Sequence, residues 1–138
     1  MTEIPVRRSL DASVEIASVD AVLDTLASWW AEVGDVAPRV RHGFETAVVE
    51  IAGNIVEHAT GDATARRFRV ELSADSRSLT ATLVDDGEPL AIDPMTTTMA
   101  EVDDENGRGL ALARAGVDRL DYSHDRGRNV WRLESGRG

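Results

Sequence analysis

The spacing of apolar residues predicts three helices along the chain. In residues 18–34 and 38–59 apolar side chains recur every three or four positions, a pattern typical of a helix with one buried face. We expect Ser18 to cap the first helix, and residues 107–116 to form a third, shorter one. The buried sides of the first two helices are expected to contain Val19, Val22, Leu23, Leu26, Trp30 and Val33, and then Val40, Phe44, Ala47, Val48, Ile51 and Ile55.

Alternation with a period of two predicts the strands. They are expected at residues 7–16, 67–72, 79–85, 117–122 and 129–133, and the last two should form a hairpin. Because the strands are grouped and do not alternate with helices, the expected fold class is α+β. We expect a two-layer sandwich with a mostly antiparallel mixed sheet and helices on one face.

The length and composition limit the classes of protein. A chain of 138 residues is about the length of one domain, so we expect residues 1–138 to form a single domain. No apolar run approaches the roughly 18 residues of a membrane span, and no secretory segment is visible, so we expect a cytoplasmic protein without membrane contact. The absence of cysteine excludes disulfides and Cys-ligated metals. A net charge of −10 disfavours direct nucleic-acid binding.

All fifteen basic residues are arginine. The absence of lysine excludes a Walker A loop, a protein kinase of the eukaryotic type and a Schiff-base enzyme, because each needs a lysine amine. If the protein binds phosphates, it must therefore use backbone amides, arginine and a metal ion.

The second predicted helix carries a set of polar residues on one flank. Glu50, Asn54 and His58 follow one another at intervals of four, so they share one side of the helix beside its apolar stripe. A carboxylate in that position can accept a proton, and an amide oxygen can hold a hard cation. The alternative is that Glu50 and Asn54 belong to the solvated face of the helix and that His58 is a helix-end residue.

Two further motifs follow. Asp85 and Gly87 stand where the strand at 79–85 ends, so a carboxylate is followed by bare backbone that a ligand can approach. The alternative is an ordinary turn, because Asp-Gly, here Asp86-Gly87, is among the commonest turn dipeptides. Gly107, Arg108 and Gly109 then open the third predicted helix, where exposed amides can approach an anion. Taken alone, a Gly-x-Gly sequence is a weak signal.

The three motifs in this order resemble the N, G1 and G2 boxes of the GHKL ATP-binding superfamily. The stretches that carry the resemblance are ETAVVEIAGNIVEHA, VDDGEPLAIDP and GRGLALARAGVDRLDY. More closely, the chain looks like the small stand-alone bacterial anti-sigma factors and serine kinases of the RsbW and SpoIIAB type, from about Arg7 to Glu134. The resemblance implies the Bergerat, or histidine-kinase-like ATPase, fold and the binding of ATP with Mg²⁺.

The resemblance also implies roles for residues of the first two boxes. Glu50 matches the general base, which deprotonates an acceptor serine or a water. Asn54 matches the amide that ligates the Mg²⁺ ion bridging the ATP phosphates. Asp85 matches the carboxylate that binds the adenine amino group, and Gly87 matches the residue that lets the base lie close. His58 matches a residue that we regard as structural.

In the third box, Gly107 and Gly109 match the glycines that cradle the phosphates. Leu110 completes the Gly-x-Gly-Leu sequence, and the position of Arg108 between the glycines suggests a guanidinium within reach of phosphate. The segment Glu88–Asn106 is expected to form the lid of the site. One departure concerns the closing hairpin, where the superfamily often has a Gly-Thr pair that helps to hold adenine. This chain has Gly127-Arg128-Asn129 there instead, which puts that contact in doubt.

The function that the resemblance implies is a serine-protein kinase that is also an anti-sigma factor. Its expected partners are a small anti-sigma-factor antagonist, which it phosphorylates, and a sigma factor, which it sequesters. Relatives of this type are often dimers, so a homodimer is an open alternative. Two rival functions remain at this stage: an ATP-binding adaptor that transfers no phosphoryl group, and a structural domain that binds no nucleotide.

Overall fold

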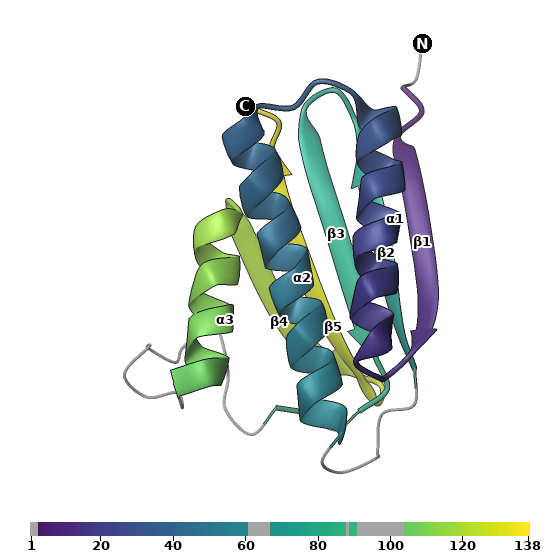
Figure 1. Cartoon of the computed structure of the whole chain (residues 1–138), viewed down its shortest axis with the longest axis vertical. Coiled ribbons are helices and arrows are strands. Elements are labelled where there is room, and N and C mark those ends of the chain that lie inside the picture. Colours follow the sequence, from purple (N-terminus) through teal and green to yellow (C-terminus); the bar gives the residue numbers. More distant parts are fainter. Residues whose placement is uncertain (1–2, 61–66, 88, 91–103) are drawn as a thin grey trace.

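The computed structural model describes residues 3–60, 67–87, 89–90 and 104–138, with the side chains of 58–60 and 104–107 excepted. These residues form three helices and one five-stranded sheet (Figure 1). None of the helices within these ranges combines the length and the apolar character that a membrane span requires. In chain order the elements are β1 (Val6–Ser13), α1 (Ala17–Val33), α2 (Pro38–Thr60), β2 (Arg67–Ala74), β3 (Ser78–Asp85), α3 (Asp104–Gly116), β4 (Arg119–Asp125) and β5 (Arg128–Gly136).

The sheet has the strand order β1-β2-β3-β5-β4. The three helices lie together on one face of it, as Figure 1 shows. The predicted α+β two-layer sandwich is therefore confirmed. The expected sheet was mostly antiparallel and mixed, whereas every neighbouring pair among the described strands is antiparallel.

Alternation along the strands separates a buried face from a polar one. In β2 and β3 each apolar residue of the alternating set is buried under the helices, and its neighbours point to the other face. On that other face the Arg69 guanidinium pairs with the carboxylates of Glu71 and Asp11. The hydrogen bond that Arg69 donates to Glu71 and the charge of Asp11 raise the pKa of Arg69 above its ordinary value. The strand pattern thus fixes which side chains face the helices.

The centre of the helical layer is a group of aromatic side chains. Trp29 and Trp30 lie with their ring centroids 4.7 Å apart, and both contact Phe44 of α2. Trp29 is fully buried and its Nε1 donates a hydrogen bond to the Val6 carbonyl at 2.9 Å. The sequence pattern missed Trp29 and included Leu23, which is 40% exposed. The reason is that α1 contacts both the sheet and α2, so its buried sector is wider and differently centred than one stripe.

Two helix starts differ from the sequence prediction. The residue before α1 is Ile16, which makes no capping hydrogen bond through its side chain, and Ser18 is buried inside the helix. The predicted cap is therefore wrong. The third helix begins at Asp104, three residues before the predicted start at Gly107, because polar residues that look like loop continue the helix.

A two-residue turn closes the last hairpin. Asp125 pairs with Arg128, and the two residues between them, Arg126 and Gly127, have φ angles of 55° and 76°. Positive φ at both central positions matches the right-handed twist of the flanking strands. The predicted hairpin is confirmed, with strands longer than the sequence pattern indicated.

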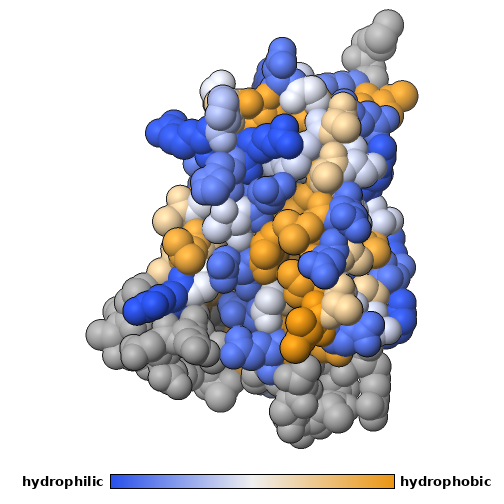
Figure 2. Space-filling model, in the orientation of Figure 1, coloured by the Kyte–Doolittle hydropathy of each residue, from blue (hydrophilic) through white to orange (hydrophobic). Residues whose placement is uncertain are grey.

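The outer surface of the helical layer is mixed in polarity. Figure 2 shows polar side chains over much of it and apolar side chains along the seam between α1 and α2. A close contact in this layer joins α2 to α3, where the two backbones touch. A Cβ atom added to Gly43 would lie 2.5 Å from the carbonyl oxygen of Gly116, and one added to Gly116 would lie even closer to Gly43. Only glycine at both positions permits this approach.

We predict that Gly43→Ala and Gly116→Ala each lower the free energy of unfolding by about 1–3 kcal/mol, because the added methyl group overlaps backbone that cannot move aside. The matched control is Gly53→Ala on the same helix. Apart from the neighbouring backbone of its own helix, no described atom lies within 4 Å of its added Cβ, so the better helix former should raise stability by about 0.5–1 kcal/mol. Urea denaturation measures all three, and equal effects at Gly43 and Gly53 would contradict the contact.

Candidate functional site

The residues singled out from the sequence gather at one end of the molecule. They come from the second half of α2, the end of β3 and the first half of α3, which lie together at the lower end of Figure 1. The expected lid, 88–106, lies mostly outside the described residues. Of it, Pro89 and Leu90 are described, and 104–106 belong to α3.

Glu50 and Asn54 of α2 face Gly109 of α3. A Cβ atom added to Gly109 would lie 2.8 Å from Glu50 Oε2 and 3.6 Å from Asn54 Oδ1. Both polar side chains are half-buried, and Gly109 is buried. The structure thus brings together residues from the first and third sequence motifs, and the missing side chain of Gly109 makes the room for the two polar groups.

The remaining residues of the third motif occupy different surroundings. Arg108 is exposed, whereas Leu110 is buried and belongs to the hydrophobic core. Since α3 begins at Asp104, the backbone amides of Gly107 and Gly109 lie beyond the first three helical residues, whose N–H groups have no intrahelical acceptor, so the two glycines do not open the helix as the sequence predicted. The His58 side chain lies outside the described residues.

Asp85 is a buried carboxylate, 7% exposed, at the end of β3. Its Oδ1 accepts a hydrogen bond from the backbone N–H of Gly87 at 2.9 Å. The Asp-x-Gly sequence therefore forms a turn in which the aspartate side chain binds the backbone two residues on. The same oxygen accepts a second hydrogen bond, from Asn129 Nδ2 at 3.0 Å. Both described hydrogen bonds end on Oδ1, so they fix the carboxylate from one side.

Asn129 is a residue whose contacts the sequence analysis did not foresee. It is 2% exposed, and its Oδ1 accepts a hydrogen bond from the Tyr122 hydroxyl at 2.5 Å. The backbone N–H of Leu90 donates to the same hydroxyl at 3.1 Å. The signal was present in the strand pattern, because Asn129 occupies the same alternating set as Trp131 and Leu133, both buried. A polar residue in a buried set needs a partner.

No cluster of three or more His, Asp or Glu side chains that could hold a metal ion occurs in the described part of the chain. Asn54 Oδ1 and the Glu50 carboxylate, on the same flank of α2, remain the hard donors that face Gly109 of α3.

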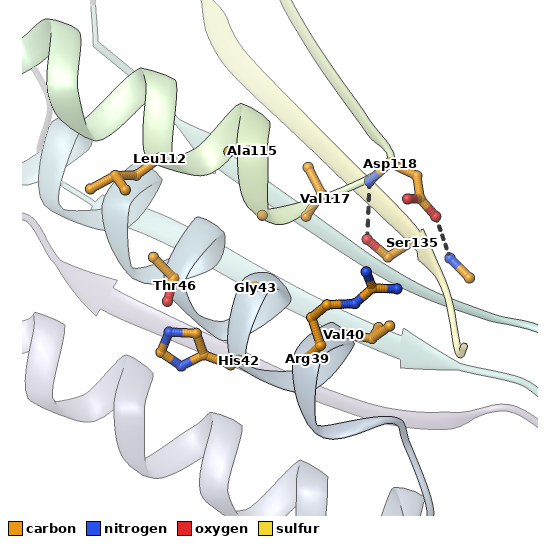
Figure 3. A pocket seen from close by; sticks show the side chains of 12 residues that line it. Arg39, Val40, His42, Gly43, Thr46, Leu112, Ala115, Val117, Asp118 and Ser135 are labelled. Atoms are coloured by element: carbon orange, nitrogen blue, oxygen red, sulfur yellow. Dashed lines mark hydrogen bonds between the residues drawn. The ribbon is translucent and has the colours of Figure 1, made fainter.

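A cavity of about 450 Å³ lies elsewhere, between the first half of α2 and the end of α3 (Figure 3). Among its lining residues, the N–H of Asp118 donates to Ser135 Oγ, and Asp118 Oδ2 accepts from the N–H of Gly136. None of the described residues of the predicted site lines this cavity. Its walls include Arg39, His42, Thr46, Leu112, Ala115 and Val117.

Comparisons with known proteins agree with the fold. A family model described as "Histidine kinase-like ATPase domain" matches residues 12–134. Among solved structures, the crystal structure of the RsbU and RsbW domains of Rv1364c from Mycobacterium tuberculosis matches with a TM-score of 0.61 and 21% sequence identity. The match covers 93% of this chain and 32% of that one, so this chain spans about a third of its length. At that identity the likeness concerns the fold alone. No match to a curated protein was found.

The contact between Gly109 and Glu50 predicts an energetic coupling. In Gly109→Ala the new methyl group must displace the Glu50 carboxylate, whereas in the Glu50→Ala background the obstacle is gone. We expect the two substitutions to couple by about 0.5–2 kcal/mol in the free energy of unfolding, which a double-mutant cycle in urea measures. Glu32→Ala on α1 is the control, since Glu32 pairs with Arg8 and should show additivity. Additivity at Glu50 as well would refute the geometry.

Proposed function

The chain belongs to the histidine kinase-like ATPase domain family, and from this membership we propose that it is a cytoplasmic ATP·Mg²⁺-dependent protein serine kinase and anti-sigma factor. The proposed acceptor is a serine of a small anti-sigma-factor antagonist, and the second proposed partner is a sigma factor that the protein sequesters. The membership agrees with the resemblance to the GHKL superfamily that the sequence motifs carry. The observation that carries the kinase proposal is the meeting of Glu50 and Asn54 at Gly109.

Asp85 supports the choice of nucleotide. A carboxylate is an acceptor of hydrogen bonds, and the exocyclic amino group of adenine is a donor. Oδ1 already accepts from Gly87 and Asn129, so Oδ2 is the oxygen that we assign to the amino group. A base that carries a carbonyl oxygen at that position would place this acceptor against Asp85 Oδ2, which is also an acceptor.

The donor set fits Mg²⁺, which is commonly bound by one or two protein oxygens together with substrate phosphates and water. We assign Asn54 Oδ1 as the protein ligand. When bound, the ion neutralises part of the phosphate charge. Arg108, an exposed residue in the first half of α3, is the group that we assign to the phosphates.

Glu50 is the proposed general base. Its carboxylate takes the proton of the acceptor serine hydroxyl while the serine oxygen forms a bond to the γ-phosphorus. The bond from that phosphorus to its bridging oxygen breaks, and ADP leaves with the electron pair. Half-burial beside Gly109 holds the carboxylate on the flank of α2 and limits the positions that its oxygens can take.

The alternative function is an ATP-binding partner-switching adaptor without phosphoryl transfer. The two functions differ in whether the partner protein is phosphorylated on serine. A partner captured from an extract of the native host and identified by mass spectrometry is modified on serine by the kinase and stays unmodified with the adaptor.

We expect Glu50→Gln to leave the ATP affinity nearly unchanged and to lower phosphoryl transfer about 10²–10⁴-fold, because a general base acts in the transition state. Calorimetric titration measures the affinity, and single-turnover labelling of the captured partner measures the transfer. Equal transfer by wild type and Glu50→Gln would show that Glu50 is not the base. Tight ATP binding without any transfer by wild type would favour the adaptor.

Asn54→Ala tests the metal assignment separately. For the wild type, we expect Mg²⁺ to strengthen ATP binding, since the ion links the phosphates to Asn54. In Asn54→Ala the difference between titrations with Mg²⁺ and with EDTA should largely disappear, while the affinity in EDTA stays the same. A full Mg²⁺ effect in the variant would place the metal ligand elsewhere. A melting temperature of the wild type that ATP and Mg²⁺ leave unchanged would contradict nucleotide binding altogether.

A further inference from the structure

We propose that Asn129 is the positioning residue of the base site: its amide fixes the orientation of Asp85 so that Oδ2 meets the 6-amino group of the purine. The inference rests on the proposed ATP binding. It assigns a role to a residue of the Gly127-Arg128-Asn129 segment, which stands where the superfamily often has a Gly-Thr pair. The contacts of this one amide carry the argument.

The orientation of the Asn129 amide is set by the groups around it. Nδ2 donates to Asp85 Oδ1 at 3.0 Å and lies 3.4 Å from the carbonyl oxygen of Gly87. Both of these groups are acceptors, so only the NH₂ side of the amide can face them. A flipped amide would place its oxygen against a buried carboxylate oxygen, which costs free energy in surroundings that exclude water.

The opposite side of the amide faces donors. Its Oδ1 accepts a hydrogen bond from the Tyr122 hydroxyl and lies 3.0 Å from Nδ1 of His124, which donates to it in the tautomer that carries the proton on Nδ1. The Tyr122 ring is itself held, with its centroid 4.6 Å from that of Trp131. The amide therefore has acceptors on one side and donors on the other, and rotation would break both sets of hydrogen bonds.

Asp85 and Asn129 are also direct neighbours in the sheet. They form the last register pair between β3 and β5, and His124 pairs with Asn129 from β4. The distance between the amide and the carboxylate is therefore fixed by the strands and does not depend on a loop. Asn129 can therefore support Asp85 as a binding group, because a hydrogen-bonding side chain on a rigid strand locks the rotamer of its neighbour.

The role makes a specific prediction about nucleotide recognition. If Asn129 acts by aiming Oδ2 at the amino group, its loss must weaken only nucleotides that carry that group. Purine riboside triphosphate has the purine, ribose and triphosphate of ATP but hydrogen in place of the 6-amino group. A merely structural role would weaken ATP and this analogue equally.

The experiment compares dissociation constants for ATP and for purine riboside triphosphate, with Mg²⁺, in the full chain. We expect the wild type to prefer ATP, and Asn129→Ala to weaken ATP about tenfold, the worth of one hydrogen bond to a charged group. The analogue should change less than about twofold, so the preference for ATP collapses. Asn129→Asp keeps the size of the side chain but turns a carboxylate toward Asp85, so this variant should lose the preference for ATP as well. If Asn129→Ala does not fold, the result for Asn129→Asp decides between the two outcomes.

Two controls complete the design. Arg132→Ala changes an exposed side chain on the same strand and should leave both dissociation constants as in the wild type. In the Asp85→Ala background, Asn129→Ala should have no further effect on ATP, because the group it positions is gone. The proposal is overturned if the variants weaken both nucleotides equally or neither. A wild type that binds neither nucleotide overturns the proposed function and the inference together, whereas a wild type that prefers ATP while Asn129→Ala keeps that preference overturns the inference alone.

Discussion

The backbone contact between Gly43 and Gly116 is the constraint on which the arrangement of the helices depends. It sets the separation of α2 and α3 at one end of the pair. From there the helices run in opposite directions, and Gly43 precedes Glu50 by seven residues just as Gly109 precedes Gly116 by seven. At 1.5 Å per residue both intervals span about 10 Å, so the second contact, Glu50 with Gly109, falls in register with the first. Two glycines thus bring a carboxylate and an amide within reach of α3.

The other half of the candidate site depends on the sheet. Asp85 and Asn129 are opposite each other across β3 and β5, and both occupy positions that face the helices. Burial alone would disfavour a carboxylate there, and the N–H of Gly87 and the amide of Asn129 offset that cost. The site is therefore built from two rigid pairings, one between helices and one between strands, and each supplies polar groups to the same end of the molecule (Figure 1).

The sequence was sufficient for the strands, the first two helices and the family, because alternation and helical spacing report directly on which side of an element is buried. It did not predict burial or contacts that depend on how separate elements pack together. Trp29 is buried because α1 contacts two neighbours, and Ser18 is not a cap because the helix already begins at Ala17. The meeting of Gly109 with Glu50 depends on tertiary distance, as do the contacts of Asn129, and no spacing along the chain encodes that distance. The chemical roles of Glu50, Asn54 and Asp85 stay predictions from the resemblance.

The turn at Arg126 and Gly127 has a consequence for the chemistry of the base site. Its two residues fix which residues of β4 stand opposite β5, and side chains on a strand change face with every step. One residue more in the turn, with the pairing shifted to match, would bring Ser123 or Asp121 into the place of Tyr122. The oxygen of the Asn129 amide would then lose the phenol that holds it. The length of an exposed turn thus helps to decide which polar atoms Asn129 and Asp85 present in the proposed base site.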